Sequence, residues 1–170
     1  AVGLANNLAA AFVDNHIHHG NRLNIDPYGP TLRRVVDISD RWALDDIITG
    51  LGSGLVRRTG FDITVASEVM AILGMSRDLA DVRRRLGLIV IGANRKGDPV
   101  TAEELEVAGA MAAILQRAID PTIMQTTEGT LAFVHTGPFA NIVRGVPIDA
   151  AGEYTGSLWT LLTPSPSWAA

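Results

Sequence analysis

Residues 88–92 form a continuous apolar run, Leu-Ile-Val-Ile-Gly, between two segments that carry helix signals. Such runs are typical of strands buried on both faces of a parallel sheet. Before the run, Ser76 can cap a helix over 77–86. After it, Thr101 and Glu104 form a capping-box pattern for a helix that we expect to reach about residue 119. Helix, strand and helix in this order predict an α/β protein.

The remaining segments alternate in the same way. Apolar residues at helical spacing predict a helix from the start of the chain that ends before Gly20. An Ala-, Glu- and Met-rich segment favours a helix over 65–73. Three short segments favour strands: 33–38, 121–125 and 131–135. Strands that alternate with helices indicate βαβ units and therefore a parallel sheet.

Charge and composition argue against several classes of protein. The chain has 170 residues, with 14 Lys and Arg against 18 Asp and Glu, and a net charge of −4. A nucleic-acid partner is not expected, because such proteins need clustered surplus positive charge. No apolar run approaches the roughly 18–20 residues that span a bilayer, and the first residues lack the basic flank of a leader. We expect a cytoplasmic protein without a membrane partner.

The single lysine, Lys96, lies in a turn-like run at 94–99. A phosphate-binding loop of the Gly-Lys-Ser/Thr type needs its lysine at the start of a helix, where the ammonium reaches the outer phosphates. The sequence therefore contains no such loop. It also contains no cysteine, which excludes a thiolate nucleophile and a cysteine-ligated zinc site.

Four polar side chains gather near the end of the first predicted helix: Asp14, His16, His18 and His19. Asp14 and His18 are four residues apart and share a helix face, which is compatible with a zinc or iron site. The spacing is equally compatible with a solvated helix end or with a place in a substrate site. We therefore assign no metal ligand from the sequence.

His135 follows a predicted strand and precedes Gly137 and Pro138. At the carboxyl edge of a parallel sheet, where α/β proteins bind ligands, its imidazole could donate to an oxyanion or move a proton. Alternatively, His135 fixes a turn. The spacing of the residues does not separate the two interpretations.

Four stretches of the chain resemble the formate–tetrahydrofolate ligase family. They are Ala-Asn-Asn-Leu at 5–8 leading to Asp-Asn-His at 14–16, Leu-Asn-Ile-Asp-Pro at 23–27, the run from Gly60 to Leu73, and the segment 125–142 that contains His135. The resemblance is nearly continuous to about Gly145. It implies a partial, P-loop-NTPase-like parallel sheet with flanking helices over 1–145, and an atypical tail over 146–170.

The resemblance also implies a reaction. Members of the family phosphorylate formate with ATP and Mg²⁺ and pass the formyl group to tetrahydrofolate, usually as homo-oligomers. His135 corresponds to the histidine beside the formyl phosphate intermediate, and Asn141 and Val143 belong to the same substrate-binding loop. Asp14 resembles an acidic residue that could accept a proton from the folate amine. Asp62 and Glu68 are expected either to stabilise the fold or to support the site indirectly.

This chain departs from the family pattern at two places. Val143 and Arg144 replace an Ala-His pair beside the intermediate, and residues 55–59 replace an Asn-Gly-Val/Ile-Pro-Arg-Glu-Asp pattern. Family members are also much longer. Our first hypothesis is therefore a part of the ligase that is inactive alone, because the ATP loop and the folate-stacking region lie elsewhere in the family. The alternatives are an interaction module that associates with a full-length ligase and a metal-binding protein.

Overall fold

The computed structural model describes residues 1–50, 52 and 54–136. In this part of the chain, helices and short strands alternate in a mixed α/β arrangement. The helices are α1 (Val2–His18), α2 (Glu68–Met75), α3 (Leu79–Gly87) and α4 (Ala108–Leu115). The strands are β1 (Arg34–Val35), β2 (Ile47–Gly50), β3 (Val56–Thr59), β4 (Phe61–Asp62), β5 (Val90–Ala93), β6 (Pro99–Thr101), β7 (Thr122–Gln125) and β8 (Leu131–Val134).

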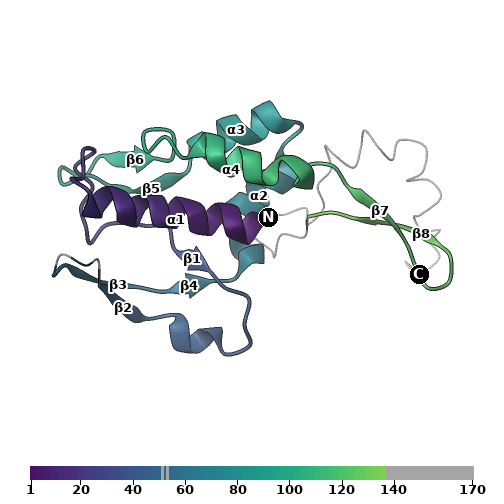
Figure 1. Ribbon diagram of the computed structural model, residues 1–170, viewed down its shortest axis with the longest axis horizontal. Helices are drawn as coiled ribbons and strands as arrows, with labels where there is room; N and C mark the ends of the chain where they lie inside the picture. The colour runs from purple at the N-terminus through teal and green to yellow at the C-terminus, as the bar shows by residue number, and fades with distance from the viewer. Residues whose placement is uncertain (51, 53, 137–170) are drawn as a thin grey trace, which may run out of the picture.

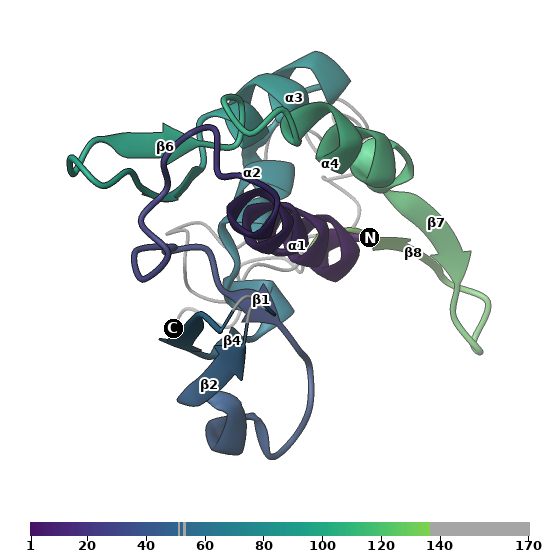
Figure 2. The same cartoon turned by 60° about the vertical axis from the view of Figure 1, so that its left-hand side comes forward.

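α1 lies at the centre of this arrangement. It has α3 and α4 on one side and strands β1–β4 on the other, and the β7–β8 hairpin extends away from the helices (Figures 1 and 2). α1 contacts α4, and α4 contacts α3. The buried face of α1 presents Ala5 and Ala9, whose small side chains let the facing helix approach closely, and Met111 of α4 is fully buried in the same cluster. Burial of these apolar side chains is the main stabilising contribution of this core.

The strands of the described residues form four separate two-stranded sheets. β1 and β4 pair in parallel, with Arg34 opposite Phe61, whereas β2–β3, β5–β6 and β7–β8 are antiparallel pairs. The α/β class is therefore confirmed in its coarse form. Among the described residues only β1 and β4 pair in parallel, so the partial, P-loop-NTPase-like parallel sheet that we expected is not confirmed.

The expectation that residues 88–92 form a doubly buried parallel strand is wrong. β5 pairs antiparallel with β6. Burial alternates along residues 88–91, since Ile89 and Ile91 are buried while Leu88 and Val90 are 65% and 45% exposed. The cause lies in the turn that follows. The Asn94 Oδ1 atom accepts hydrogen bonds from the backbone N–H groups of Lys96 and Asp98, so the chain reverses at once.

Two further boundaries differ from the sequence expectations. The capping-box contacts form as predicted, because Thr101 and Glu104 are hydrogen-bonded to each other through backbone and side chain. Glu106 then adopts a φ of 62°, which interrupts the helical path, and α4 begins only at Ala108. The second difference is at α3, whose N-terminal cap is Asp78 and not Ser76. The Asp78 side chain accepts a hydrogen bond from the Asp81 N–H at 2.8 Å.

The expectation that β8 ends at the edge of a parallel sheet is also wrong. β7 and β8 form a hairpin. A turn joins the two strands, and the Gly129 N–H donates a hydrogen bond to the Thr126 carbonyl in this turn.

The first helix agrees with its prediction. α1 ends at His18, and Gly20 follows with a φ of 104°, a conformation that favours glycine. No helix in the described residues is both long enough and apolar enough to cross a membrane.

Candidate functional site

Asp14 is held between two guanidinium groups from different strands. Its Oδ2 lies 2.8 Å from Arg34 Nη1 on β1, and its Oδ1 lies 2.6 Å from Arg57 Nη2 on β3. The Arg57 side chain is only 5% exposed and the Asp14 side chain 18% exposed. These ion pairs tie α1 to β1 and β3, and they neutralise an arginine that would be costly to bury alone.

His135 lies at the opposite end of α1. It lines a pocket of about 410 Å³ together with Ala1, Val2, Arg117 and Asp120. Its Nε2 atom is buried and has no hydrogen-bond partner. Burial lowers the pKa of His135 below its ordinary value, and the nearby Asp120 carboxylate opposes this effect only in part. The imidazole is therefore neutral near pH 7.

The structure does not bring the two predicted catalytic residues together. Val2 lines the His135 pocket, and Asp14 is on the same helix, about 18 Å further along at 1.5 Å per residue. Direct action of both side chains on one reacting atom is not compatible with this separation. The predicted substrate-binding residues Asn141 and Val143 lie outside the described residues.

The histidines at the end of α1 have local partners. His16 Nε2 accepts a hydrogen bond from the Leu23 N–H at 3.0 Å, and the rings of His18 and His19 meet edge to face at 4.6 Å. Partial burial and the positive charge of Arg22 lower the pKa of His16. In residues 1–50, 52 and 54–136, no three His, Asp or Glu side chains are grouped so that they could hold a metal ion.

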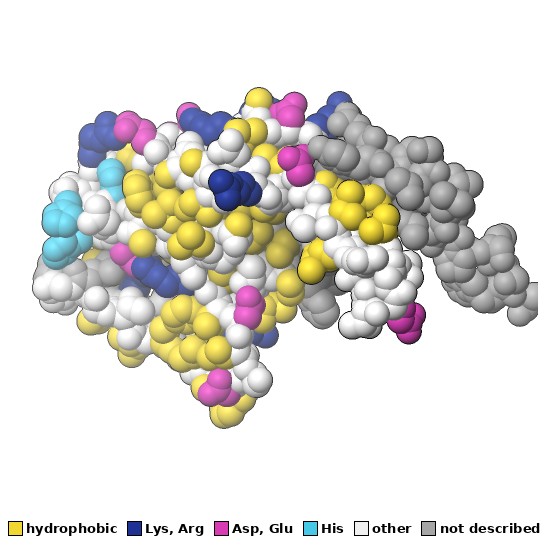
Figure 3. Space-filling view, turned by 45° about the vertical axis from the view of Figure 1, so that its right-hand side comes forward, with side chains coloured by type: hydrophobic (Ala, Val, Ile, Leu, Met, Phe, Trp, Pro, Cys, Tyr) yellow, Lys and Arg dark blue, Asp and Glu magenta, His cyan; other side chains and the backbone are white. Residues whose placement is uncertain are grey.

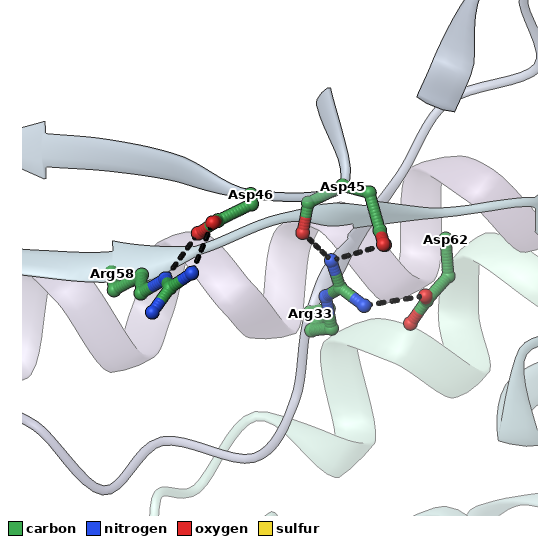
Figure 4. Close-up of polar contacts among 5 residues, drawn as sticks. All are labelled: Arg33, Asp45, Asp46, Arg58 and Asp62. Atoms are coloured by element: carbon green, nitrogen blue, oxygen red, sulfur yellow. Dashed lines mark hydrogen bonds and ion pairs between the residues drawn. The ribbon is translucent and has the colours of Figure 1, made fainter. Parts of the chain in front are cut away.

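Asp62 and Ser67 have contacts that support the fold locally. Arg33 lies between Asp62 and Asp45, with Nη1 3.2 Å from Asp62 Oδ1 and Nη2 3.0 Å from Asp45 Oδ1 (Figure 4). Ser67 caps α2 by accepting from the Met70 N–H. Glu68 follows in the first turn, and burial raises the pKa of its carboxyl. The contact of Asp62 with Arg33 stabilises the fold locally, and an indirect role of Asp62 in the site stays a prediction.

Sequence reasoning missed the arginines of this region. Arg34 directly precedes the β-branched pair Val35-Val36, and Arg57 lies in the segment that departs from the family pattern. An arginine inside a predicted strand is a signal for a buried ion pair, since its charge needs a partner there. The sequence offered no means of choosing Asp14 as that partner.

Comparison with known proteins first indicates a class, because the curated relatives of this chain are ligases. Residues 1–154 match the family model described as formate–tetrahydrofolate ligase, and the chain belongs to this family. The match extends past the boundary that we expected at residue 145.

Two relatives illustrate the similarity. A formate–tetrahydrofolate ligase from Roseiflexus sp. (strain RS-1) is 60% identical over 148 residues, which cover 85% of this chain and 26% of the relative. A formate–tetrahydrofolate ligase from Saccharopolyspora erythraea is 57% identical over 159 residues, which cover 92% of this chain and 28% of the relative. The chain thus spans about a quarter of the length of the curated relatives it matches.

Proposed function

We propose that this chain supplies part of the formyl-transfer site of a formate–tetrahydrofolate ligase. In the proposed reaction, ATP phosphorylates formate, and the amine of tetrahydrofolate then attacks the carbonyl carbon of formyl phosphate. A C–N bond forms, phosphate leaves, and the amine loses a proton. Family membership and the environment of His135 support this proposal.

The unpartnered Nε2 atom of His135 is the observation that carries the proposal. A neutral imidazole is able to donate a hydrogen bond from one nitrogen and accept one at the other. Thr136 in the same pocket has an unpartnered hydroxyl, and Arg117 adds a positive charge. Donors of this kind stabilise the negative charge that develops on the carbonyl oxygen and the phosphate during attack.

Asp14 has a different role in this proposal. Both of its carboxylate oxygens are engaged by Arg34 and Arg57, so it is suited to hold these arginines in place. The proton-accepting role expected for Asp14 stays a prediction. The homo-oligomer and the cytoplasmic location expected from the resemblance also stay predictions.

Binding of ATP and Mg²⁺ is assigned to other parts of the ligase. Lys96 lies in the turn between β5 and β6, away from any helix start, and the 170 residues contain no Gly-Lys-Ser/Thr loop. The described residues offer no group of three acidic or histidine side chains for a metal ion. We therefore expect no formate-dependent ADP release when the purified chain is given ATP, formate and tetrahydrofolate. Measured turnover would contradict this expectation.

A chimeric ligase tests the positive part of the proposal. Residues 1–136 of this chain would replace the matching segment of the Roseiflexus ligase, and we expect the chimera to retain formate-dependent activity. A second chimera with residues 1–145 adds Val143 and Arg144. If only the second chimera is inactive, the departure at these positions is responsible. If the first one folds but is inactive, the segment does not serve the reaction.

An interaction module is the second candidate, and exposed apolar surface favours it. On α1, Leu4 is 65% exposed, and on the β7–β8 hairpin Ile123 and Leu131 are 62% and 61% exposed. In the view of Figure 3, hydrophobic side chains gather at the surface of the molecule. Such surface is typical of an interface. Co-purification of the chain with a full-length ligase, lost in a Leu4→Lys variant, would support this function.

A further inference from the structure

The base of the β7–β8 hairpin brings two distant segments to the His135 pocket. In the antiparallel ladder Thr122 lies opposite Val134, and both residues line this pocket. The segment that enters β7 and the segment that leaves β8 therefore run side by side at this end of the hairpin. Asp120 on the first segment and His135 on the second also line the pocket. The hairpin thus places a carboxylate and an imidazole at one cavity.

The position of Asp120 follows from a change in the path of the chain. The 3₁₀ helix η3 (Gln116–Ala118) ends just before it. Pro121 comes directly after Asp120, and a residue that precedes proline is disfavoured in the helical conformation. The chain therefore leaves the helical path here and continues into β7.

The charges in this pocket connect Asp120 with His135. Other charges in the described lining come from Arg117 and, in the isolated chain, from the amino group of Ala1. Asp120 is the residue whose charge raises the pKa of the imidazole, against the larger lowering by burial. A nearby carboxylate has this effect because it stabilises the protonated imidazole.

The Nε2 atom of His135 is available to accept a proton. It is buried without a hydrogen-bond partner, and the imidazole is neutral near pH 7 because burial lowers its pKa. Met70 and Leu73 add apolar side chains to the lining of the same pocket. A cation in such surroundings is costly unless an opposite charge is near. The Asp120 carboxylate supplies that charge once the imidazole is protonated.

We propose that His135 accepts the proton that the folate amine loses, and that Asp120 is the positioning residue whose negative charge stabilises the resulting imidazolium. This inference rests on the proposed function. As the amine nitrogen bonds to the carbonyl carbon, its proton passes to Nε2. The bond from that carbon to the phosphate oxygen breaks, and its electron pair leaves with the phosphate. The protonated Nε2 then donates a hydrogen bond to the leaving phosphate.

Nuclear magnetic resonance of the purified chain tests the pairing without turnover. The imidazole signals of His135, identified by their absence in His135→Ala, would be followed as the pH is changed. We expect Asp120→Asn to lower the pKa of His135, whereas Asp120→Glu keeps the charge and should largely preserve it. Glu128→Gln removes one charge from the exposed turn of the same hairpin and is the matched control. An unmoved His135 pKa in Asp120→Asn would overturn the proposal.

The pH dependence of kcat in the chimera with residues 1–136 tests the proton transfer. Because a base acts in its neutral form, kcat should rise with pH through the pKa of His135 to a plateau. Asp120→Asn should move this rise to lower pH and reduce the plateau by about tenfold, since it leaves a weaker base. Asp120→Glu should restore both features.

The outcomes separate this inference from the function on which it rests. A loss of kcat in Asp120→Asn that is equal at every pH would assign Asp120 a structural role and overturn the inference. An active chimera whose pH profile is unchanged by Asp120→Asn would overturn the inference alone. A chimera that folds but is inactive would overturn the proposed function, and this inference with it.

Discussion

Arg57 Nη2 lies 2.6 Å from Asp14 Oδ1, and this ion pair joins β3 to the last turns of α1. The same carboxylate also binds Arg34 of β1. A single acidic side chain thus links three elements that are far apart in the sequence. The carboxylate that we predicted as catalytic is, in this structure, the centre of a buried ion-pair cluster.

Replacing Asp14 with asparagine should destabilise the fold strongly. The Asp14→Asn variant leaves Arg57 buried without a counter-charge, and breaking a buried pair in this way costs about 3 kcal/mol or more. Chemical unfolding of the two proteins, followed by circular dichroism, measures the difference. Asp46→Asn is the matched control, because Asp46 pairs with Arg58 at an exposed position (Figure 4) and should have little effect. Equal losses of unfolding free energy in the two variants would contradict the role of Asp14 in holding Arg34 and Arg57 in place.

Two glycine substitutions should have opposite effects on stability. A Cβ atom at Gly60 would overlap the Arg33 guanidinium and the Asp45 carbonyl, and Arg33 is the residue that joins Asp45 to Asp62. We expect Gly60→Ala to cost about 1–3 kcal/mol of unfolding free energy through overpacking.

Gly109 provides the contrast, because it lies inside α4 and a Cβ there would meet only Arg83 Nε at 3.7 Å. Gly109→Ala should raise the unfolding free energy by about 0.5–1 kcal/mol, since alanine has the higher helix propensity. Thermal unfolding of both variants would measure the effects. A destabilised Gly109→Ala variant would show that α4 is more crowded than the structure indicates.

The stability of the fold should fall in mild acid through His16. Its neutral Nε2 accepts the Leu23 N–H bond, and partial burial and Arg22 lower its pKa from the ordinary 6.5. A group whose pKa is lowered by folding contributes stability above its unfolded pKa and loses it as the pH falls through the folded pKa. Unfolding free energies measured between pH 8 and pH 5 should therefore decrease toward low pH.

A His16→Gln variant isolates this contribution. The glutamine amide oxygen is able to accept the same hydrogen bond without titrating, so the pH dependence should become shallower. His19→Gln, at the exposed end of the helix, is the control and should retain the original slope. An unchanged slope in His16→Gln would assign the acid sensitivity to other groups.

Within the active chimera, His135→Ala should reduce kcat by roughly 100- to 1000-fold, because alanine removes the hydrogen-bond donor to the developing negative charge. The KM values for ATP should change little, because ATP binding is assigned to other parts of the ligase. Steady-state kinetics with all three substrates would test this. A variant that loses only affinity for tetrahydrofolate would instead place His135 in the folate site.

Local sequence patterns predicted some features of the fold and could not predict others. The capping contacts of Thr101 and Glu104 form as expected because both partners lie within one turn of each other. The start of the helix did not follow from this pattern, since Glu106 with its φ of 62° interrupts the helical path and α4 begins only at Ala108. The pairing of β5 could not be predicted from its composition either, because an apolar strand is compatible with a parallel or an antiparallel partner. The turn at Asn94 reverses the chain, and β5 therefore pairs with β6.

The sequence by itself determined the family, the first helix and its end before Gly20, because these depend on residue identity within short windows. Only the tertiary structure decided that Asp14 binds Arg34 and Arg57, that His135 lies at the other end of α1, and that Thr49 lies opposite Arg57 in the β2–β3 ladder. The physical reason is that ion pairs, strand pairing and burial are set by residues distant in the chain, whose contacts form only when helices and hairpins pack together.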